Sequence, residues 1–223
     1  MRGRKTRRQG SWLAVAVGTV QILAAGGARG ECGPYEDETR TSHRELRWGD
    51  FQGQRPERVR RAGRKPVEIA HVATTISYYT EVATRREGTD WIAEPADLCV
   101  QAFMLKDRSG YKRERRTRWD LDHEQGHFDI THYFAESLHA QLAQLEQRAA
   151  SESEAQDGLL ERLERERVEA VARWRKLQAR YDQETRHSQR KPAQRRWRDE
   201  IGALLETLLP TQTGDVLVAA TAP

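Results

Sequence analysis

The five residues from His123 to His127 read His-Glu-Gln-Gly-His, and their types and spacing suit the binding of one cation. Residues i and i+4 of a helix lie on the same face about one turn apart, so the ring nitrogens of His123 and His127 can bind a single Zn²⁺. Glu124 stands beside the pair, where a carboxylate can take up and return protons. The string therefore predicts a metal site that activates water for hydrolysis.

This spacing is the HExxH motif of zinc metallopeptidases. In that chemistry Zn²⁺ lowers the pKa of a bound water and polarises the scissile carbonyl, and the glutamate passes the water proton to the leaving amine. We expect Glu124 to be this general base and the hydroxyl of Tyr181 or Tyr133 to stabilise the oxyanion. The alternative is a surface helix that carries two solvated histidines.

The motif is expected near the start of a long helix. From Trp119 onward, apolar residues recur at steps of three and four, which predicts one buried stripe along an amphipathic helix. The stripe consists of Phe128, Thr131, Ala135, Leu138, Leu142, Leu145 and Ala149. A polar break over residues 151–158 precedes a second predicted helix from Leu159 to about His187, and a last amphipathic helix is predicted from Pro192 to Leu209.

The first two helices are expected to fold back on each other, because a short polar break between helices normally gives an antiparallel hairpin. If the turn lies near residue 154, residues 123–127 face residues 181–185 to within one helical turn. The segment 181–187 reads Tyr-Asp-Gln-Glu-Thr-Arg-His and is rich in potential ligands. A catalytic zinc ion takes three protein ligands and keeps one position open, so this segment is expected to supply the third ligand.

Within that segment, His187 is the first choice for the third ligand, because the helix is expected to end there and let the ring turn inward. Glu184 is the alternative, because it continues the inward stripe of the helix. Asp182 is expected to hold a ligand imidazole by a hydrogen bond. A further polar set occupies another face of the first helix and is expected to face solvent: His132, Glu136 and His139.

Residues 46–118 are predicted to be mainly β. The stretch from Val67 to Tyr79 is rich in β-branched and aromatic residues, and Val100–Leu105 is a second strand candidate bounded by Pro95 on its N-terminal side. The expected fold class is therefore α+β, with a small antiparallel sheet followed by a long helical hairpin that carries a zincin-like HExxH site. The metallopeptidase domain is expected over residues 46–209, helical from residue 119 onward.

Residues 1–30 are predicted to be a signal peptide, followed by an N-terminal arm over residues 31–45. The segment has a basic start, an apolar stretch from Trp12 to Ala25 and small residues at a cleavage site at 28–30. The protein is thus expected to be exported, periplasmic or secreted, and to keep no integral membrane span after cleavage. An uncleaved N-terminal anchor is the alternative, and residues 210–223 are expected to form a flexible tail.

The charge balance limits the class of binding partner, and the cysteine content indicates a disulfide. Residues 1–30 hold six Lys and Arg and no acidic residue, so the other 32 basic and 34 acidic residues leave a net charge of −2 in place of +4. This balance offers no support for nucleic-acid binding, and a peptide or protein substrate is expected from the HExxH motif. Cys32 and Cys99 are expected to form a disulfide that ties the arm to the domain, with two unpaired buried thiols as the alternative.

On these residues, the chain resembles a bacterial family catalogued as domain of unknown function family 922. Its members are described as secreted Zn-dependent proteases, an activity that is inferred from their sequences. The resemblance covers about residues 45–201. Its strings are Trp48-Gly-Asp50-Phe51, His123-Glu-Gln-Gly-His-Phe-Asp-Ile130 and Tyr181-Asp-Gln-Glu-Thr-Arg-His187, with Gln194 and Trp197 after them.

The resemblance implies that His123 and His127 are metal ligands and that Glu124 is the catalytic base. It also implies a family histidine at the position of His187. The chain departs from the family pattern at His132, where an acidic residue is expected, and in an Arg-rich loop that ends at Arg118.

Two other classes of function stay open. A catalytically inactive scaffold or binding protein of the cell envelope would bind zinc in stoichiometric amount without cleaving peptides. Alternatively, the helices over 128–150 and 159–187 form an interaction module in which the histidines are incidental, so that a chelator leaves stability unchanged. Neither a cleavage preference nor an oligomeric state follows from the sequence.

Overall fold

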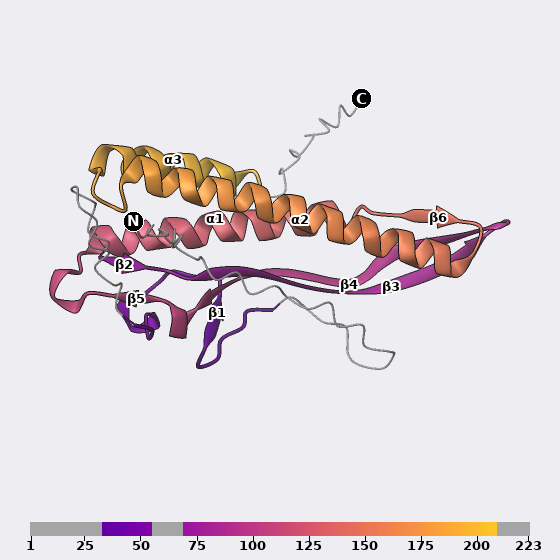
Figure 1. Cartoon of the computed structure of the whole chain (residues 1–223), viewed down its shortest axis with the longest axis horizontal. Helices are drawn as coiled ribbons and strands as arrows, with labels where there is room; N and C mark the ends of the chain where they lie inside the picture. The colour runs from indigo at the N-terminus through magenta and orange to yellow at the C-terminus, as the bar shows by residue number, and fades with distance from the viewer. Residues whose placement is uncertain (1–32, 55–68, 209–223) are drawn as a thin grey trace, which may run out of the picture.

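A long antiparallel sheet with three helices on one of its faces makes up the described part of the chain (Figure 1). The computed structural model describes residues 33–54 and 69–208. The predicted signal peptide over 1–30, Cys32 and the predicted tail over 210–223 lie outside the described residues. The α+β class expected from the sequence is confirmed.

The sheet is built around one long hairpin, in which β3 (Thr74–Glu87) pairs with β4 (Asp90–Leu105). Gly88 supplies the positive φ of 64° that the tight turn between them requires. On its other side, β4 pairs with β1 (Arg40–Ser42) at one end and with β6 (Gln147–Ala149) at the other. Part of the predicted N-terminal arm is therefore a strand of the sheet.

A second, two-stranded sheet joins β2 (Ala70–His71) to β5 (Gly110–Tyr111). Cys99 lies in β4 and is disulfide-bonded, as predicted for this residue. Short 3-10 turns complete the β half at Trp48–Asp50, Lys106–Arg108 and Arg113–Arg115.

The main strands run further than the sequence predicts. β4 begins at Asp90 and not at Val100, and Pro95, expected to bound the strand, lies inside it opposite Val82. Among the described residues, β4 is paired on its second side only at Trp91–Ala93 and Phe103–Leu105. Pro95 falls between these two stretches, where one edge of β4 is unpaired and a strand accommodates a residue without an N–H.

The helices are α1 (Arg118–Leu142), α2 (Glu152–Thr185) and α3 (Lys191–Glu206). The polar break was predicted at 151–158, but the structure places it at 143–151. Ser151 causes the difference, because its side chain accepts a hydrogen bond from the N–H of Glu154 and caps α2 there. Ala149 was assigned to the first helix by the apolar stripe, whereas it lies in β6.

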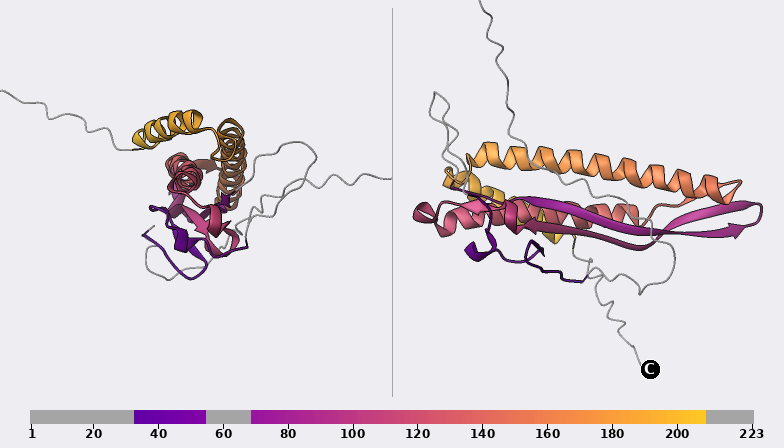
Figure 2. Two further views of the ribbon diagram at one scale, coloured as in Figure 1. Left: turned by 90° about the vertical axis from the view of Figure 1, so that its left-hand side faces the viewer. Right: turned by 60° about the horizontal axis from the view of Figure 1, so that its bottom comes forward.

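The helices α1 and α2 lie antiparallel over one face of the sheet, and α3 packs against both of them on the side away from the sheet (Figure 2). The core between α1, α2 and the sheet includes Phe128, Leu138, Leu142, Leu159 and Leu163, each at most 2 % exposed. A second apolar cluster joins α1, α2 and α3. Its buried members are Ile130, Trp174, Tyr181, Trp197 and Ile201.

The predicted register of the α1–α2 hairpin is confirmed to within one helical turn. Successive pairs of residues, four apart in each helix, are hydrogen-bonded across the interface: His123 with Asp182, His127 with Gln178, and Thr131 with Trp174. The metal motif therefore faces the C-terminal end of α2.

Gly126 permits the close approach of the two helices at this end. A Cβ atom there would lie 2.5 Å from the hydroxyl oxygen of Tyr181, whose side chain is buried. We expect Gly126→Ala to lower the free energy of unfolding by about 1–3 kcal/mol through overpacking. Chemical denaturation measures the change.

Gly202→Ala in α3 is the matched control, because a Cβ there meets no atom within 4 Å. This substitution should raise stability by about 0.5–1 kcal/mol, the usual gain from replacing glycine inside a helix. Equal effects of the two substitutions would contradict the steric explanation.

Candidate metal centre

Side chains from α1 and α2 bring three potential metal ligands together. The Nε2 atom of His123 lies 3.2 Å, and that of His127 lies 3.0 Å, from Oδ1 of Asp182. One ligand atom of each residue lies within 4.8 Å of the others, so this group could hold a metal ion. Asp182, predicted only to support a ligand, is thus itself placed as a candidate ligand.

His187 approaches the same oxygen from the turn that follows α2. Its Nδ1 atom lies 3.0 Å from Oδ1 of Asp182, so nitrogens of three histidines surround one carboxylate oxygen. The His187 side chain is 39 % exposed, whereas that of His123 is 2 % exposed. The group therefore has a buried side on α1 and a solvent-facing side at His187.

The turn that carries His187 is unusual in its backbone. Arg186, His187 and Ser188 have φ values of 51°, 49° and 69°, in the left-handed region that non-glycine residues rarely adopt. Ser188 fastens this turn to the start of α1: its hydroxyl donates to Asp120 at 2.6 Å, and its carbonyl accepts from the indole of Trp119 at 2.9 Å. The first turn of α1 thus helps to place His187.

Glu184, the alternative third ligand, points away from the group. Its carboxylate accepts hydrogen bonds from Arg180 and Arg196 at 2.8 Å and from the indole of Trp197 at 2.9 Å, on the side of α3. Positions 182 and 184 are about 200° apart around a helix, so the two carboxylates cannot face the same partner. The structure brings Asp182, not Glu184, to the histidines.

The three residues of the group differ in charge. Burial opposes the charge of Asp182, but the positive charge of His127 and hydrogen bonds from the histidines outweigh it and hold the pKa of Asp182 far below its usual range. Burial also opposes the charge of His127, yet Asp182 raises the pKa of His127 to about 9. Burial dominates at His123 and lowers its pKa to about 4. In the ion-free protein, an anionic Asp182 thus stands beside a charged His127 and a neutral His123, and a bound metal ion would displace a proton from His127.

Glu124 lies on the sheet side of the motif. Its side chain is buried, and Oε2 accepts a hydrogen bond of 2.7 Å from the backbone N–H of Val72, between β2 and β3. Its negative charge contributes to the raised pKa values of His127 and Tyr181, which places the carboxylate close to both. The sheet therefore fixes the orientation of the acid that the sequence assigns as general base.

Tyr181 supports the ring of His123. The two rings are stacked with centroids 4.7 Å apart, and the Tyr181 hydroxyl donates to the backbone carbonyl of His123 at 3.2 Å. Burial raises the pKa of Tyr181 far above its usual range. The hydroxyl predicted to stabilise an oxyanion is therefore engaged with the backbone of α1. The other candidate, Tyr133, packs its ring against Phe134 at 5.4 Å.

Gln178 contacts the site, and the sequence analysis did not identify it. Its Oε1 atom accepts a hydrogen bond from Nδ1 of His127, and its Nε2 atom donates to the His127 carbonyl at 2.9 Å. The antiparallel register offers a signal for it, because residue 178 faces residue 127 just as 182 faces 123.

The set predicted to face solvent is partly buried instead. His132 stacks on His43 from the N-terminal segment with ring centroids 4.0 Å apart, and His43 is bonded to Asp129 at 2.8 Å. Burial, together with the nearby His43, lowers the pKa of His132 to about 4. Glu136 lies 3.7 Å from Nδ1 of His132. This face of α1 therefore receives the N-terminal segment.

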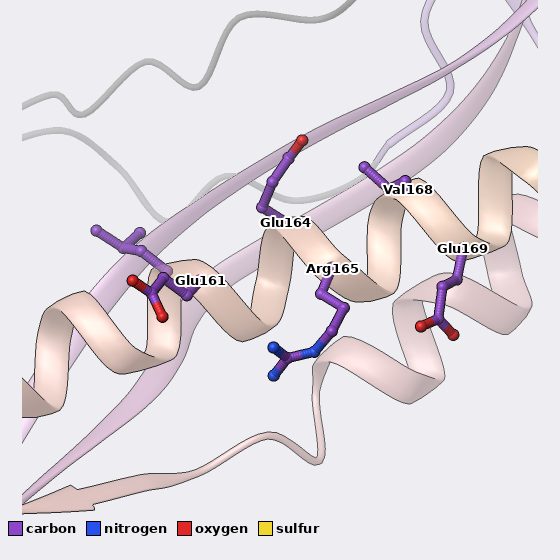
Figure 3. Close-up of a pocket in the computed structure, with 6 residues that line it drawn as sticks. Glu161, Glu164, Arg165, Val168 and Glu169 are labelled. Carbon is purple, nitrogen blue, oxygen red and sulfur yellow. The ribbon is translucent and has the colours of Figure 1, made fainter.

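An open hollow on the surface of α2 is unrelated to the metal group (Figure 3). Its walls come from a single helix and contain no histidine: Leu160, Glu161, Glu164, Arg165, Val168 and Glu169. At 1.5 Å per residue, it ends about 20 Å along α2 from Asp182.

Comparison with known proteins adds no relative: no family model, no curated protein and no solved structure matches the chain. Among the described residues, no helix has both the length and the apolar character needed to cross a membrane. The geometry of the group around Asp182 is therefore the main indication of function.

We expect the full chain to bind one zinc ion and to be stabilised by it, because the ion joins α1 to α2. The gain is about 4 kcal/mol when free zinc exceeds the dissociation constant roughly 1,000-fold. Titration calorimetry and thermal unfolding measure both quantities. His127→Ala should abolish the gain, and His139→Ala, on the same helix, should preserve it. Equal zinc responses of the two variants would exclude this site.

Acid should destabilise the protein in part through His132. A pKa lowered from 6.5 to about 4 contributes stability above pH 6.5 that is lost as the pH falls through about 4. His132→Gln should therefore lose less stability than the wild type between about pH 7 and about pH 4 in denaturant unfolding. His139→Gln is the control and should behave as the wild type. An unchanged acid response in His132→Gln would disprove the assignment.

Proposed function

We propose that this protein is a zinc-dependent metallopeptidase whose general base is Glu124. The observation that carries the proposal is the convergence of His123, His127 and Asp182 in an HExxH setting, with Glu124 held beside them. Imidazole nitrogens and a carboxylate oxygen are ligands that zinc prefers. His187 stands at the solvent-facing side of the same group.

Zinc, when bound, supplies Lewis-acid chemistry that acidifies water and polarises a peptide carbonyl. The chain's own residues supply the rest. His123 and His127 would hold the ion from α1, and Asp182 would hold it from α2. Glu124 takes a proton from the attacking water and returns it to the leaving amine.

The position of Glu124 supports this role. The hydrogen bond from the Val72 N–H fixes the carboxylate relative to the histidines, so the base needs little reorganisation before it accepts a proton. Because Glu124 directly follows His123 on α1, the helix backbone fixes its position relative to the two histidines. The capping box of Thr117 and Asp120 stabilises that start.

A structural zinc site is the second candidate, and one observation favours it. His123, His127, His187 and Asp182 together offer four donors, and structural sites are closed by four protein ligands, whereas catalytic sites keep one position open. In that case zinc would fasten α1 to α2 without turnover. The structural candidate requires His187 and Asp182 to bind the ion at the same time.

Glu124→Gln separates the two functions. If Glu124 is the base, this variant should keep zinc binding and lose turnover by roughly 10²- to 10⁴-fold. Turnover is measured as the cleavage of quenched fluorescent peptides of mixed sequence. Zinc binding is measured as the zinc content of the same protein preparations.

Glu136→Gln on the same helix is the control and should retain wild-type turnover. Wild-type turnover in Glu124→Gln would refute the role of Glu124. A wild-type protein that binds zinc and cleaves none of the peptides would favour the structural site.

A further inference from the structure

The two histidines of the motif are held differently. Nδ1 of His123 is buried and has no hydrogen-bond partner among the described residues, whereas Nδ1 of His127 is bonded to Gln178 from α2. We propose that Gln178 is a positioning residue that keeps the proton of His127 on Nδ1, so that the Nε2 lone pair faces the metal. This proposal rests on the proposed zinc site and adds the residue that orients one of its ligands.

The orientation of the Gln178 amide follows from its partners. The backbone carbonyl of His127 can only accept a hydrogen bond, so the group 2.9 Å from it must be the NH₂ of Gln178. Reversing the amide would set two oxygen acceptors against each other. Oε1 of Gln178 therefore faces Nδ1 of His127, and a carbonyl oxygen there requires that this nitrogen carry the proton.

Thr131 holds the amide in this orientation. Its hydroxyl oxygen lies 3.0 Å from Nε2 of Gln178 and 3.1 Å from the indole nitrogen of Trp174, which can only donate. The same hydroxyl lies 2.8 Å from that of Thr74 in β3. Gln178 and Trp174 are buried as well, and the network joins α1, α2 and the sheet. The core therefore fixes the amide before any ion is bound.

The nitrogen left for the ion is Nε2, which already faces Asp182 at 3.0 Å. A ring hydrogen-bonded through its other nitrogen presents its lone pair in a fixed direction, and loss of such a partner typically lowers metal affinity roughly 10- to 100-fold. Because Asp182 lies four residues after Gln178, one face of α2 supplies both the candidate ligand and the group that orients its neighbour.

Two substitutions separate this role from simple packing. Gln178→Met keeps the volume and removes every hydrogen bond, so it should lower zinc affinity roughly 10- to 100-fold. Gln178→Glu keeps an oxygen acceptor for Nδ1 of His127 but loses the NH₂ donor, so it should lose stability and still bind zinc within about threefold of the wild type. Competition with a chromophoric chelator gives the affinity, and denaturant unfolding of the metal-free protein gives the stability.

Gln194→Met is the matched control. Gln194 is also buried, and it donates to the backbone carbonyl of Trp119 on α1, but among the described residues it makes no hydrogen bond to an imidazole. Its substitution should leave zinc affinity unchanged. In the zinc-loaded wild type, nitrogen-15 NMR of labelled histidine should show His127 protonated at Nδ1, and Gln178→Met should alter that signal.

Equal losses of affinity in Gln178→Met and Gln178→Glu, in proportion to their losses of stability, would overturn the proposal. Wild-type affinity in Gln178→Met would overturn it too, as would a wild-type protein that binds no zinc at His127. Zinc binding that depends on Gln178 in a protein that cleaves no peptide would refute the peptidase assignment and leave the role of Gln178 standing.

Discussion

The contact of histidine nitrogens with a single oxygen of Asp182 is the interaction on which the rest of this structure depends. It joins the start of α1 to the end of α2 and the turn beyond α2, more than fifty residues further along the chain. Two of these imidazoles, those of His123 and His127, form with the carboxylate of Asp182 a compact group that could hold a cation. Every neighbouring element helps to keep these side chains in place.

The support is of three kinds. The absence of a side chain at Gly126 lets Tyr181 approach α1 and stack on His123. The N–H of Val72, in the link between β2 and β3, donates to Glu124, and the strained turn at 186–188 is hydrogen-bonded to the first turn of α1 through Ser188. Burial of these contacts removes competing water, so each electrostatic interaction is stronger than it would be at the surface.

Much of the fold followed from the sequence, because it depends on local periodicity. The spacing of apolar residues predicts α1 and α2, and their antiparallel pairing predicts, to within one helical turn, that the region of Tyr181 and Asp182 faces the motif. The extent of β4 and the position of the break after α1 did not follow. Pro95 and Ala149 are in strands because those segments pair with neighbouring strands. The β-propensity of a single segment does not predict such pairing.

The residues of the candidate site were likewise predictable only where a local sequence pattern determines their positions. The sequence predicts His123, Glu124 and His127 as site residues, because a single helix brings residues four apart to the same face. The choice among Asp182, Glu184 and His187 depends on which face of α2 meets α1 and on a left-handed turn, and neither is encoded in a local pattern. Gln178 was overlooked because an amide carries no charge or reactivity that marks it.

The most direct test of the account is the zinc X-ray absorption spectrum of the loaded full chain. The account predicts a nearest shell of nitrogen and oxygen atoms at about 2.0–2.1 Å, with multiple scattering from at least two imidazoles and loss of that signal in His127→Ala. A shell made of oxygen alone, without imidazole scattering, would contradict it.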